Sequence, residues 1–287
     1  MTATAEPQTD ALLAGFASEE RGVARAFLHT WPAHSGAPLA VVIAAFNEQQ
    51  TVAGVVHEVP QTICGLATEV IVVVDGAHDQ TAARALQAGA LVCDVPFNRG
   101  QGAALRLGYR LARARGAELI ATVDADGQYE PRQLERLVAP ILAGDVDFVS
   151  GSRRLGDELT EDPVRRLGVR VFGVLIGILI GHRITDPAFG LRAMRAELTA
   201  NVTLEQPQYQ ASELMISAAM RGYRLAEAPA TMRARPEHAG TTKKGGNLLY
   251  GTRFARVVLG TWVREIRRGR GGSGSRRWRG SANTHSS

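Results

Sequence analysis

The chain has 287 residues, of which 45% are hydrophobic and 21% are charged, a composition typical of a soluble globular protein with a sizeable core. Its two cysteines, Cys64 and Cys93, exclude a disulfide framework and favour a reducing cytosol, where both thiols would serve as small buried apolar groups. The net charge of +5 is divided between +11 over residues 233–287 and −6 over residues 1–232. This division favours an anionic lipid or phosphate surface as the partner of the C-terminal end, and the acidic body argues against a nucleic-acid-binding protein.

The first 37 residues are predicted to form an N-terminal extension. They contain Glu6, Asp10, Glu19 and Glu20 and lack the basic stretch and apolar core of a signal peptide. Apolar residues spaced between positions 16 and 28 predict one short helix in this extension.

Five apolar runs follow, each with the length and continuity of a strand buried on both faces. They are Leu39–Ala45, Glu69–Val74, Leu91–Val95, Leu119–Val123 and Asp147–Ser150. The segments between them have the apolar period of helices. Strands that alternate with helices predict βαβ units, and therefore an α/β fold with a mostly parallel, Rossmann-like sheet flanked by helices.

Polar side chains follow four of these strands. Asn47 and Glu48 follow the first, Asp75 the second, Asp124–Gln128 the fourth, and Arg153 the fifth. Sites in parallel sheets lie at the C-terminal strand ends, so we expect these residues to meet in one crevice. A single polar strand end is an ordinary turn, whereas four that carry acids, an amide and an arginine indicate a site.

Asp124 and Asp126 are two residues apart at a strand end. In an extended chain both carboxylates would point to one side and repel each other unless a cation or proton lay between them. Hard oxygen ligands suit Mg²⁺ or Mn²⁺ held against a phosphate, although a solvated loop with two acids explains the spacing equally well. A calcium loop does not fit, because its sixth position requires glycine and is Tyr129 here.

The chain changes character after Arg153. A helix is predicted over residues 163–181, with Arg165 and Arg166 near its start. Its second half is apolar nearly all round, so it is either buried or in contact with lipid. The longest apolar run, Val171–Gly181, is about half of the roughly 20 residues that span a bilayer, so the chain is not predicted to cross a membrane.

The C-terminal part is predicted to be basic. Short strands are expected at Tyr223–Ala228 and Thr231–Arg235, followed by a basic amphipathic helix over residues 246–268 and a disordered tail over residues 269–287. Basic residues near an anionic surface contribute about 1 kcal/mol each. We therefore expect a cytoplasmic protein held by this helix at the inner face of the membrane.

Seven stretches in this order resemble the family 2 glycosyltransferases with the GT-A fold, and more closely the polyprenyl- and dolichyl-phosphate sugar synthases. The stretches are Phe46–Glu48, Val74–Asp79, Asn98–Ala104, Asp124–Gln128, Val149–Arg153, Asp186–Arg192 and Arg235–Lys243. They place a GT-A domain over residues 38–245. The chain departs from the family pattern at Ala45, Phe46 and Val74, where the family has proline, tyrosine and aspartate, and this leaves the base preference open.

The resemblance implies an inverting hexosyltransferase that uses a nucleotide sugar and Mg²⁺ or Mn²⁺. It implies metal ligation by Asp124, Asp126 and Gln128, and catalytic roles for Asp124, Asp126 and Arg153. The implied nucleotide-sugar contacts come from Ala45, Asn47, Glu48, Asp75, Asp124, Ala125 and Asp126. Mannose from GDP-mannose is the preferred expectation, and glucose from UDP-glucose is the alternative.

The charged residues of the chain indicate the class of acceptor. A lipid phosphate is already anionic, whereas a hydroxyl has to be deprotonated by a base. Arginine matches phosphate oxygens, so Arg153, Arg165, Arg166 and Arg235 are expected to bind a polyprenyl phosphate, with the apolar helix beside its lipid tail. A glycan or other hydroxyl acceptor stays open because the acidic residues within 157–162 could supply a base, and the same acids could instead pair with the arginines.

Two other protein classes are disfavoured. A dinucleotide-binding oxidoreductase would need G-x-G-x-x-G after the first strand, where this chain has Ala45–Glu48. A non-catalytic nucleotide-sugar-binding or scaffold protein would not need the complete set of Asp124, Asp126 and Gln128.

Overall fold

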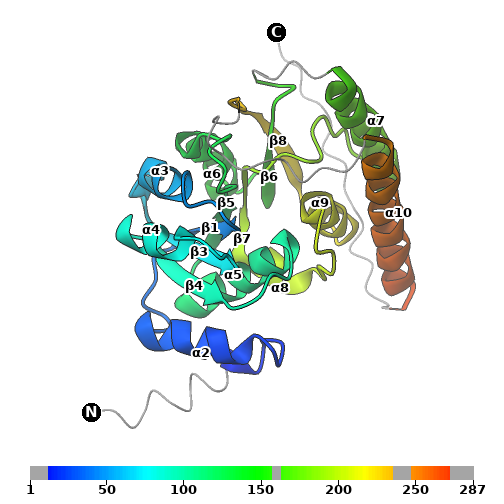
Figure 1. Ribbon diagram of the computed structural model, residues 1–287. Helices are drawn as coiled ribbons and strands as arrows, with labels where there is room; N and C mark the ends of the chain where they lie inside the picture. The colour runs from blue at the N-terminus through cyan, green and yellow to red at the C-terminus, as the bar shows by residue number, and fades with distance from the viewer. Residues whose placement is uncertain (1–11, 157–162, 235–246, 272–287) are drawn as a thin grey trace.

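A computed structural model describes residues 12–156, 163–234 and 247–271 (Figure 1). The described residues form one eight-stranded sheet with helices on both faces. From one edge to the other the strands are β4 (Leu91–Val95), β3 (Leu66–Asp75), β1 (Leu39–Ala45), β5 (Leu119–Thr122), β7 (Arg192–Arg195), β6 (Phe148–Ser152) and β8 (Leu225–Pro229). The short strand β2 (Thr62–Ile63) pairs with the start of β3 in a hairpin.

The helices divide between the two faces of the sheet. One face carries α3 (Val52–Glu58), α4 (Thr81–Gln87), the 3-10 turn η1 (Pro131–Gln133) and α6 (Leu134–Leu142), and the other carries α5 (Gln101–Arg115), α8 (Ala196–Asn201) and α9 (Gln210–Met220). Strand β1 shows why the strands are apolar throughout. Ala40 and Val42 join the core under α5, while Val41 and Ile43 join the core under α3 and α6, because successive strand residues point to opposite faces.

The sheet contains both parallel and antiparallel strand pairs. Strands β4, β3, β1 and β5 are parallel, as predicted, but β7 lies antiparallel between β5 and β6. No strand was predicted at β7, because this strand has only four residues and an arginine at each end. The expected strand at Thr231–Arg235 is also wrong for its described residues, which make a single bridge, between Met232 and Tyr129.

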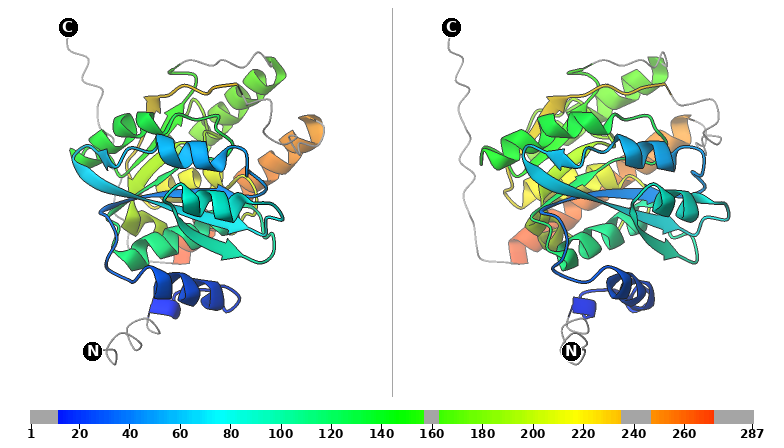
Figure 2. Two further views of the ribbon diagram at one scale, coloured as in Figure 1. Left: turned by 60° about the vertical axis from the view of Figure 1, so that its left-hand side comes forward. Right: turned by 90° about the vertical axis from the view of Figure 1, so that its left-hand side faces the viewer.

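Three helices lie at the periphery. The helix α2 (Arg21–Thr30) packs beside β4, with Ala24, Phe27 and Leu28 buried, and the two views of Figure 2 show it (dark blue) at the lower end of the molecule. At another edge α7 (Pro163–Ile180) and α10 (Asn247–Gly271) lie side by side and contact α9 (Figure 1). Among the helices of the described residues, none has both the length and the apolarity to cross a bilayer.

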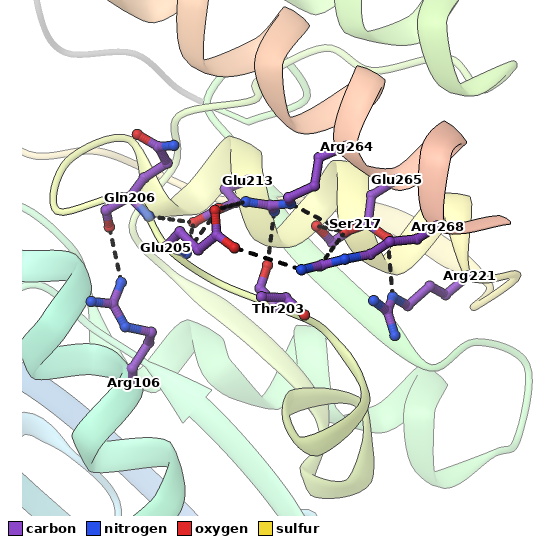
Figure 3. A network of polar contacts seen from close by, with 10 residues as sticks. All are labelled: Arg106, Thr203, Glu205, Gln206, Glu213, Ser217, Arg221, Arg264, Glu265 and Arg268. Atoms are coloured by element: carbon purple, nitrogen blue, oxygen red, sulfur yellow. Dashed lines mark hydrogen bonds and ion pairs between the residues drawn. The ribbon is translucent and has the colours of Figure 1, made fainter. Parts of the chain in front are cut away.

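A buried polar network fastens α10 to the domain (Figure 3). Arg264 of α10 donates to Glu213 of α9 at 2.9 Å and to Glu205 at 2.9 Å, and the Glu213 side chain is completely buried. Farther along α10, Glu265 accepts hydrogen bonds from Ser217 and Arg221. The basic residues of α10 are therefore divided between internal ion pairs and the exposed surface.

Candidate functional site

Asp124 and Asp126 lie on a turn just beyond β5. The strand ends at Thr122, one residue earlier than predicted, and Gly127 has a positive φ of 74°. Residues 125 and 126 form a turn, so the expected extended chain does not continue through Asp126. Burial raises the pKa of Asp124 to about 6, and the charge of the nearby Asp126 adds to this shift.

Two residues that the sequence analysis did not assign to the site act on Asp124. The side-chain amide of Gln101, at the start of α5, donates to Asp124 Oδ1 at 2.9 Å. Arg192, which is buried at the start of β7, lowers the pKa of Asp124 through its positive charge. Both residues lie inside stretches that resemble the family, but only the sheet topology brings them to the same carboxylate.

Gln128 is held by two hydrogen bonds to the backbone of Arg233. Its backbone carbonyl accepts from Arg233 N at 2.8 Å, and its Nε2 donates to the Arg233 carbonyl at 3.5 Å. The Arg233 side chain is paired with Glu130 at 2.9 Å and with Glu58 at 3.0 Å. These contacts leave Oε1 as the acceptor that Gln128 can offer to a ligand.

The donor set at this turn fits a hard divalent cation. Two carboxylates and one amide oxygen are the ligand types that Mg²⁺ and Mn²⁺ take. The pKa of Asp124 is raised first by burial and then by the charge of Asp126, and a cation between the two carboxylates would relieve their repulsion. The described residues contain no group of three or more His, Cys, Asp or Glu side chains arranged for a metal. A cation here would therefore need phosphate or water oxygens in its remaining positions.

The ends of β1 and β3 are tied together beside this turn. Asn47, which has a positive φ of 55°, accepts a hydrogen bond from His78 N at 2.9 Å. The backbone amide of Glu48 donates to the Thr81 hydroxyl at 2.9 Å. The charge of Glu48 also contributes to the raised pKa of Asp124. The structure thus brings Asn47 and Glu48 to the same edge as the two aspartates, with buried Ala45 at the end of β1 and buried Ala125 on the turn.

Asp75 is the buried last residue of β3. Its Oδ1 accepts from Arg99 N at 3.0 Å and its Oδ2 from Gly100 N at 2.7 Å. Burial raises the pKa of Asp75, and these amide donors oppose the shift. Asp75 therefore fixes the turn at residues 98–102, and its predicted contact with the nucleotide stays a prediction.

Arg153 is buried and paired with Asp186. Its Nε lies 2.6 Å from Asp186 Oδ2 and its Nη2 lies 3.2 Å from Oδ1, a geometry that fixes the guanidinium plane. Glu227 of β8 accepts from the backbone amides of Thr185 and Asp186, each at 2.8 Å. The acids at 157–162, which were the alternative partners expected for the arginines, lie outside the described part of the chain.

The segment from Asp186 to Gly190 joins Arg153 to the two-carboxylate turn. The ring of Phe189 has its centroid 5.7 Å from the Arg153 guanidinium carbon and 4.7 Å from the centroid of Tyr129. A Cβ placed on Gly190 would lie 2.4 Å from Asp124 Oδ2. The buried arginine and the acidic turn are therefore parts of one contiguous site.

Of the other three predicted phosphate ligands, only Arg166 has a described side chain. Arg166 is exposed on α7. Arg165 lies on the first turn of the same helix, and its side chain is outside the described part, as is the whole of Arg235. Their binding to an acceptor phosphate stays a prediction.

Known proteins are similar to this chain in sequence and in fold. Residues 40–203 match the family described as Glycosyl transferase family 2. The chain is 33% identical to a dolichyl-phosphate hexose transferase of Haloferax volcanii, with 77% of this chain and 94% of the relative covered. It is 28% identical to a polyprenol monophosphomannose synthase of Mycolicibacterium smegmatis, with 72% of this chain and 81% of the relative covered.

A solved structure has the same architecture. It is glucosyl-3-phosphoglycerate synthase from Mycobacterium tuberculosis in complex with Mn²⁺, uridine diphosphate and glucosyl-3-phosphoglycerate, with a TM-score of 0.61 and 22% sequence identity. The alignment covers 85% of this chain and 83% of that chain, which establishes the GT-A fold. With the family match over residues 40–203, the conclusion is that this chain belongs to glycosyltransferase family 2 and is a glycosyltransferase.

Proposed function

We propose that this enzyme transfers a hexose, with inversion, from a nucleotide sugar to a polyprenyl phosphate. The observation that carries the proposal is the single loop that joins buried Arg153 to the turn of Asp124 and Asp126. One end of the site suits a cation bound to a diphosphate, and the other suits an anionic acceptor. The dolichyl-phosphate hexose transferase and the polyprenol monophosphomannose synthase, whose names combine a lipid phosphate with a sugar, support this acceptor class.

The donor end would neutralise the leaving group. Asp124, Asp126 and Gln128 would hold Mg²⁺ or Mn²⁺, which supplies positive charge to the diphosphate as the sugar–phosphate bond breaks. Gln101 donates to Asp124, and the positive charge of Arg192 favours the ionised form of Asp124 that a cation requires. Structures of the glucosyl-3-phosphoglycerate synthase that contain uridine diphosphate with Mn²⁺ or Mg²⁺ support a divalent cation in this fold.

The acceptor end does not require a general base. A phosphate acceptor is already anionic, so its oxygen needs only to be positioned for attack on the face opposite the diphosphate. Among the described acids near Arg153, Asp186 pairs with Arg153 and Glu227 accepts two backbone amides. Asp186 and Glu227 therefore hold Arg153 and its loop in position. Arg153 would orient the phosphate, and the further phosphate contacts would come from Arg165, Arg166 and Arg235.

The donor is proposed to be GDP-mannose, because one relative is named for mannose transfer. UDP-glucose is the alternative, supported by the uridine diphosphate in the solved structure of similar fold. That structure also favours a second candidate function, in which the acceptor is a small soluble molecule with a phosphate, such as phosphoglycerate.

The proposed lipid acceptor requires contact with a membrane. On α7 the side chains of Leu167, Val171, Val174 and Ile178 are exposed, and their spacing places them in one stripe along the helix. Exposed arginines accompany the stripe on α7 and lie on the neighbouring α10: Arg166, Arg170, Arg253, Arg256 and Arg267. We infer that this surface lies on the anionic inner face of the cytoplasmic membrane.

One experiment tests donor and acceptor together. The purified protein is incubated with radiolabelled GDP-mannose or UDP-glucose and Mn²⁺, and with a polyprenyl phosphate, phosphoglycerate or a glycan as acceptor. We expect label in the lipid extract with GDP-mannose and polyprenyl phosphate, and its loss in Asp126→Ala. Transfer to phosphoglycerate or a glycan without transfer to lipid would show that the proposed acceptor is wrong.

A further inference from the structure

The turn at residues 98–102, whose last two residues begin α5, lies at the donor end of the site. The amides of Arg99 and Gly100 donate to Asp75, and Gln101 donates to Asp124 at 2.9 Å. One short turn therefore connects the end of β3 to the proposed metal site. Its position decides whether Gln101 reaches Asp124.

One side of this turn is fixed by the loop at residues 203–207. Gly102 N donates to the Pro207 carbonyl at 3.0 Å, and a Cβ on Gly102 would lie 2.0 Å from the Gln206 carbonyl oxygen. Buried Glu213 holds the loop by accepting from the amides of Glu205 and Gln206, and Figure 3 shows these residues beneath α10. Gly102 therefore contacts the backbone of Gln206 and Pro207 directly.

The other side is held by a carboxylate from the N-terminal extension. Glu20 is only 4% exposed, and its Oε1 lies 3.2 Å from Arg99 Nη1. The second oxygen of Glu20 pairs with Arg110 of α5. The neighbouring Glu19 is exposed and lies 3.9 Å from the same Arg99 nitrogen.

The packing of α2 fixes the position of Glu20. Glu20 immediately precedes α2, and Ala24, Phe27 and Leu28 of that helix are buried in the core shared with α5. The segment lies before residues 40–203, which match the family. It therefore supplies a buried carboxylate to the Arg99 side chain from outside residues 40–203.

We propose that Glu20 is a positioning residue for nucleotide binding, acting through the Arg99 side chain on the turn at residues 98–102. The inference rests on the proposed donor site. With the loop at 203–207 on one side and Glu20 on the other, the turn is held where Gly100 N meets Asp75 and Gln101 meets Asp124. Loss of the Glu20–Arg99 pair frees the turn on one side and weakens nucleotide binding, while α2 stays packed through its apolar residues.

The test separates the two ion pairs of Glu20. Arg99→Gln removes the pair that leads to the turn, Arg110→Gln removes the other, and Glu20→Gln removes the charge shared by both. Glu19→Gln is the matched control for a neighbouring exposed carboxylate. The binding of GDP and of UDP, each with Mn²⁺, is measured by calorimetry for the full chain, together with the melting temperature.

We expect Glu20→Gln and Arg99→Gln to weaken nucleotide binding about tenfold, and the double variant to be no weaker than either one. Arg110→Gln and Glu19→Gln should stay within about twofold of the wild type, because each leaves the 3.2 Å contact between Glu20 and Arg99 in place, and the Glu19 contact with Arg99 is longer, at 3.9 Å, and exposed. Hydrogen exchange should show faster exchange of the Arg99 and Gly100 amides in the first two variants only. If Glu20→Gln does not fold, the contrast between Arg99→Gln and Arg110→Gln decides the question.

Equal nucleotide binding by Arg99→Gln and the wild type overturns the proposal, even if the melting temperature falls, because the pair would then serve stability alone. Equal weakening by Arg110→Gln and Arg99→Gln also overturns it. If the wild type binds neither GDP nor UDP with Mn²⁺, the proposed function fails together with this inference. Failure of the positioning role alone is distinguished by a wild type that binds normally.

Discussion

Asp124 is placed among charges of both signs that come from separate parts of the chain. Asp126 and Glu48 disfavour its ionised form, whereas Arg192 and Gln101 favour it. Burial is the largest effect, so the pKa is raised to about 6 despite the two favourable partners. A divalent cation between the carboxylates would reverse this balance, which makes the geometry around Asp124 the feature on which donor binding depends most.

Gly190→Ala should damage this geometry without changing any ligand. The new Cβ would lie 2.4 Å from Asp124 Oδ2 and 2.5 Å from the Tyr129 ring, so Asp124 must move. We expect Mn²⁺ affinity in the presence of GDP or UDP to fall about tenfold or more, and stability to fall by about 1–3 kcal/mol from overpacking. Titration of free Mn²⁺ by electron paramagnetic resonance measures the first effect, and denaturant unfolding measures the second.

Gly168→Ala is the matched control for that variant. Gly168 lies within α7, and a Cβ there would meet nothing within 4 Å. Alanine in a helix interior is favoured over glycine by about 0.5–1 kcal/mol, so the control should be neutral or slightly stabilising, with unchanged Mn²⁺ affinity. Normal Mn²⁺ affinity in Gly190→Ala would show that Asp124 does not ligate the metal.

Asp147 makes stability depend on pH at a place remote from the site. Burial tends to raise its pKa, but hydrogen bonds from Arg224 and Arg195 outweigh burial and the pKa is lowered. Because the pKa in the folded state is below the unfolded value of about 3.9, the stabilisation is present above that value and is lost as pH falls through the folded pKa. Asp147→Asn should therefore cost about 1–2 kcal/mol near neutral pH and much less near pH 3.

The control for Asp147 is its exposed neighbour Asp145. Melting temperatures of wild type, Asp147→Asn and Asp145→Asn are compared from about pH 3 to pH 7. A difference between Asp147→Asn and the wild type that stays constant across this range would contradict the assigned cause. Asp145→Asn should follow the wild type throughout.

At the scale of elements, α10 is attached to the domain through both apolar and charged contacts. Phe254 and Val258 are buried in the core, and farther along the helix Arg264 and Glu265 are drawn inward by Glu213 and Arg221. The helix was expected to place its basic residues on a membrane. Arg264, with 16% of its side chain exposed, instead serves the fold.

Arg264→Met should therefore destabilise the protein. It leaves the completely buried Glu213 carboxylate without its arginine, and breaking a buried pair costs about 3 kcal/mol or more. Adding Glu213→Gln should recover part of the loss, because a neutral amide tolerates burial better than an unpaired charge. Denaturant unfolding of the single and double variants measures both effects.

Arg267→Met provides the comparison on the same helix, because Arg267 is exposed. It should change the free energy of unfolding by less than about 0.5 kcal/mol. If Arg264→Met is as mild as Arg267→Met, the network in Figure 3 contributes little to stability.

For the whole molecule, the sequence predicts what depends on local pattern. The continuous apolar runs predicted the four parallel strands β4, β3, β1 and β5, and the ordered motifs predicted the family. The order of strands across the sheet depends on pairing between distant segments, so the antiparallel insertion of β7 was not predicted. The contacts of Asp124 with Gln101 and of Arg153 with Asp186 follow from that topology, and for the same reason the pattern of single residues could not reveal them.

The charge of the whole chain is divided between an acidic body and a basic C-terminal part, +11 over residues 233–287 and −6 before them. An anionic surface therefore repels one part and attracts the other, which orients the molecule as it approaches. Helix α7, which carries the exposed apolar stripe, lies beside α10, which belongs to the basic part of the chain (Figure 1). Attraction by charge and burial of apolar side chains would then act on the same edge.

Vesicle binding tests this orientation. We expect the wild type to sediment with vesicles rich in phosphatidylserine and much less with phosphatidylcholine vesicles, and to be released as salt screens the arginines. Val174→Gln with Ile178→Gln removes two exposed side chains of the stripe and should weaken binding about tenfold, since each loses on the order of 1 kcal/mol of apolar burial. Leu86→Gln, at a 54% exposed leucine on α4, is the matched control and should bind as the wild type does. Equal loss in the control, or binding that does not depend on lipid charge, would contradict a membrane contact through α7 and α10.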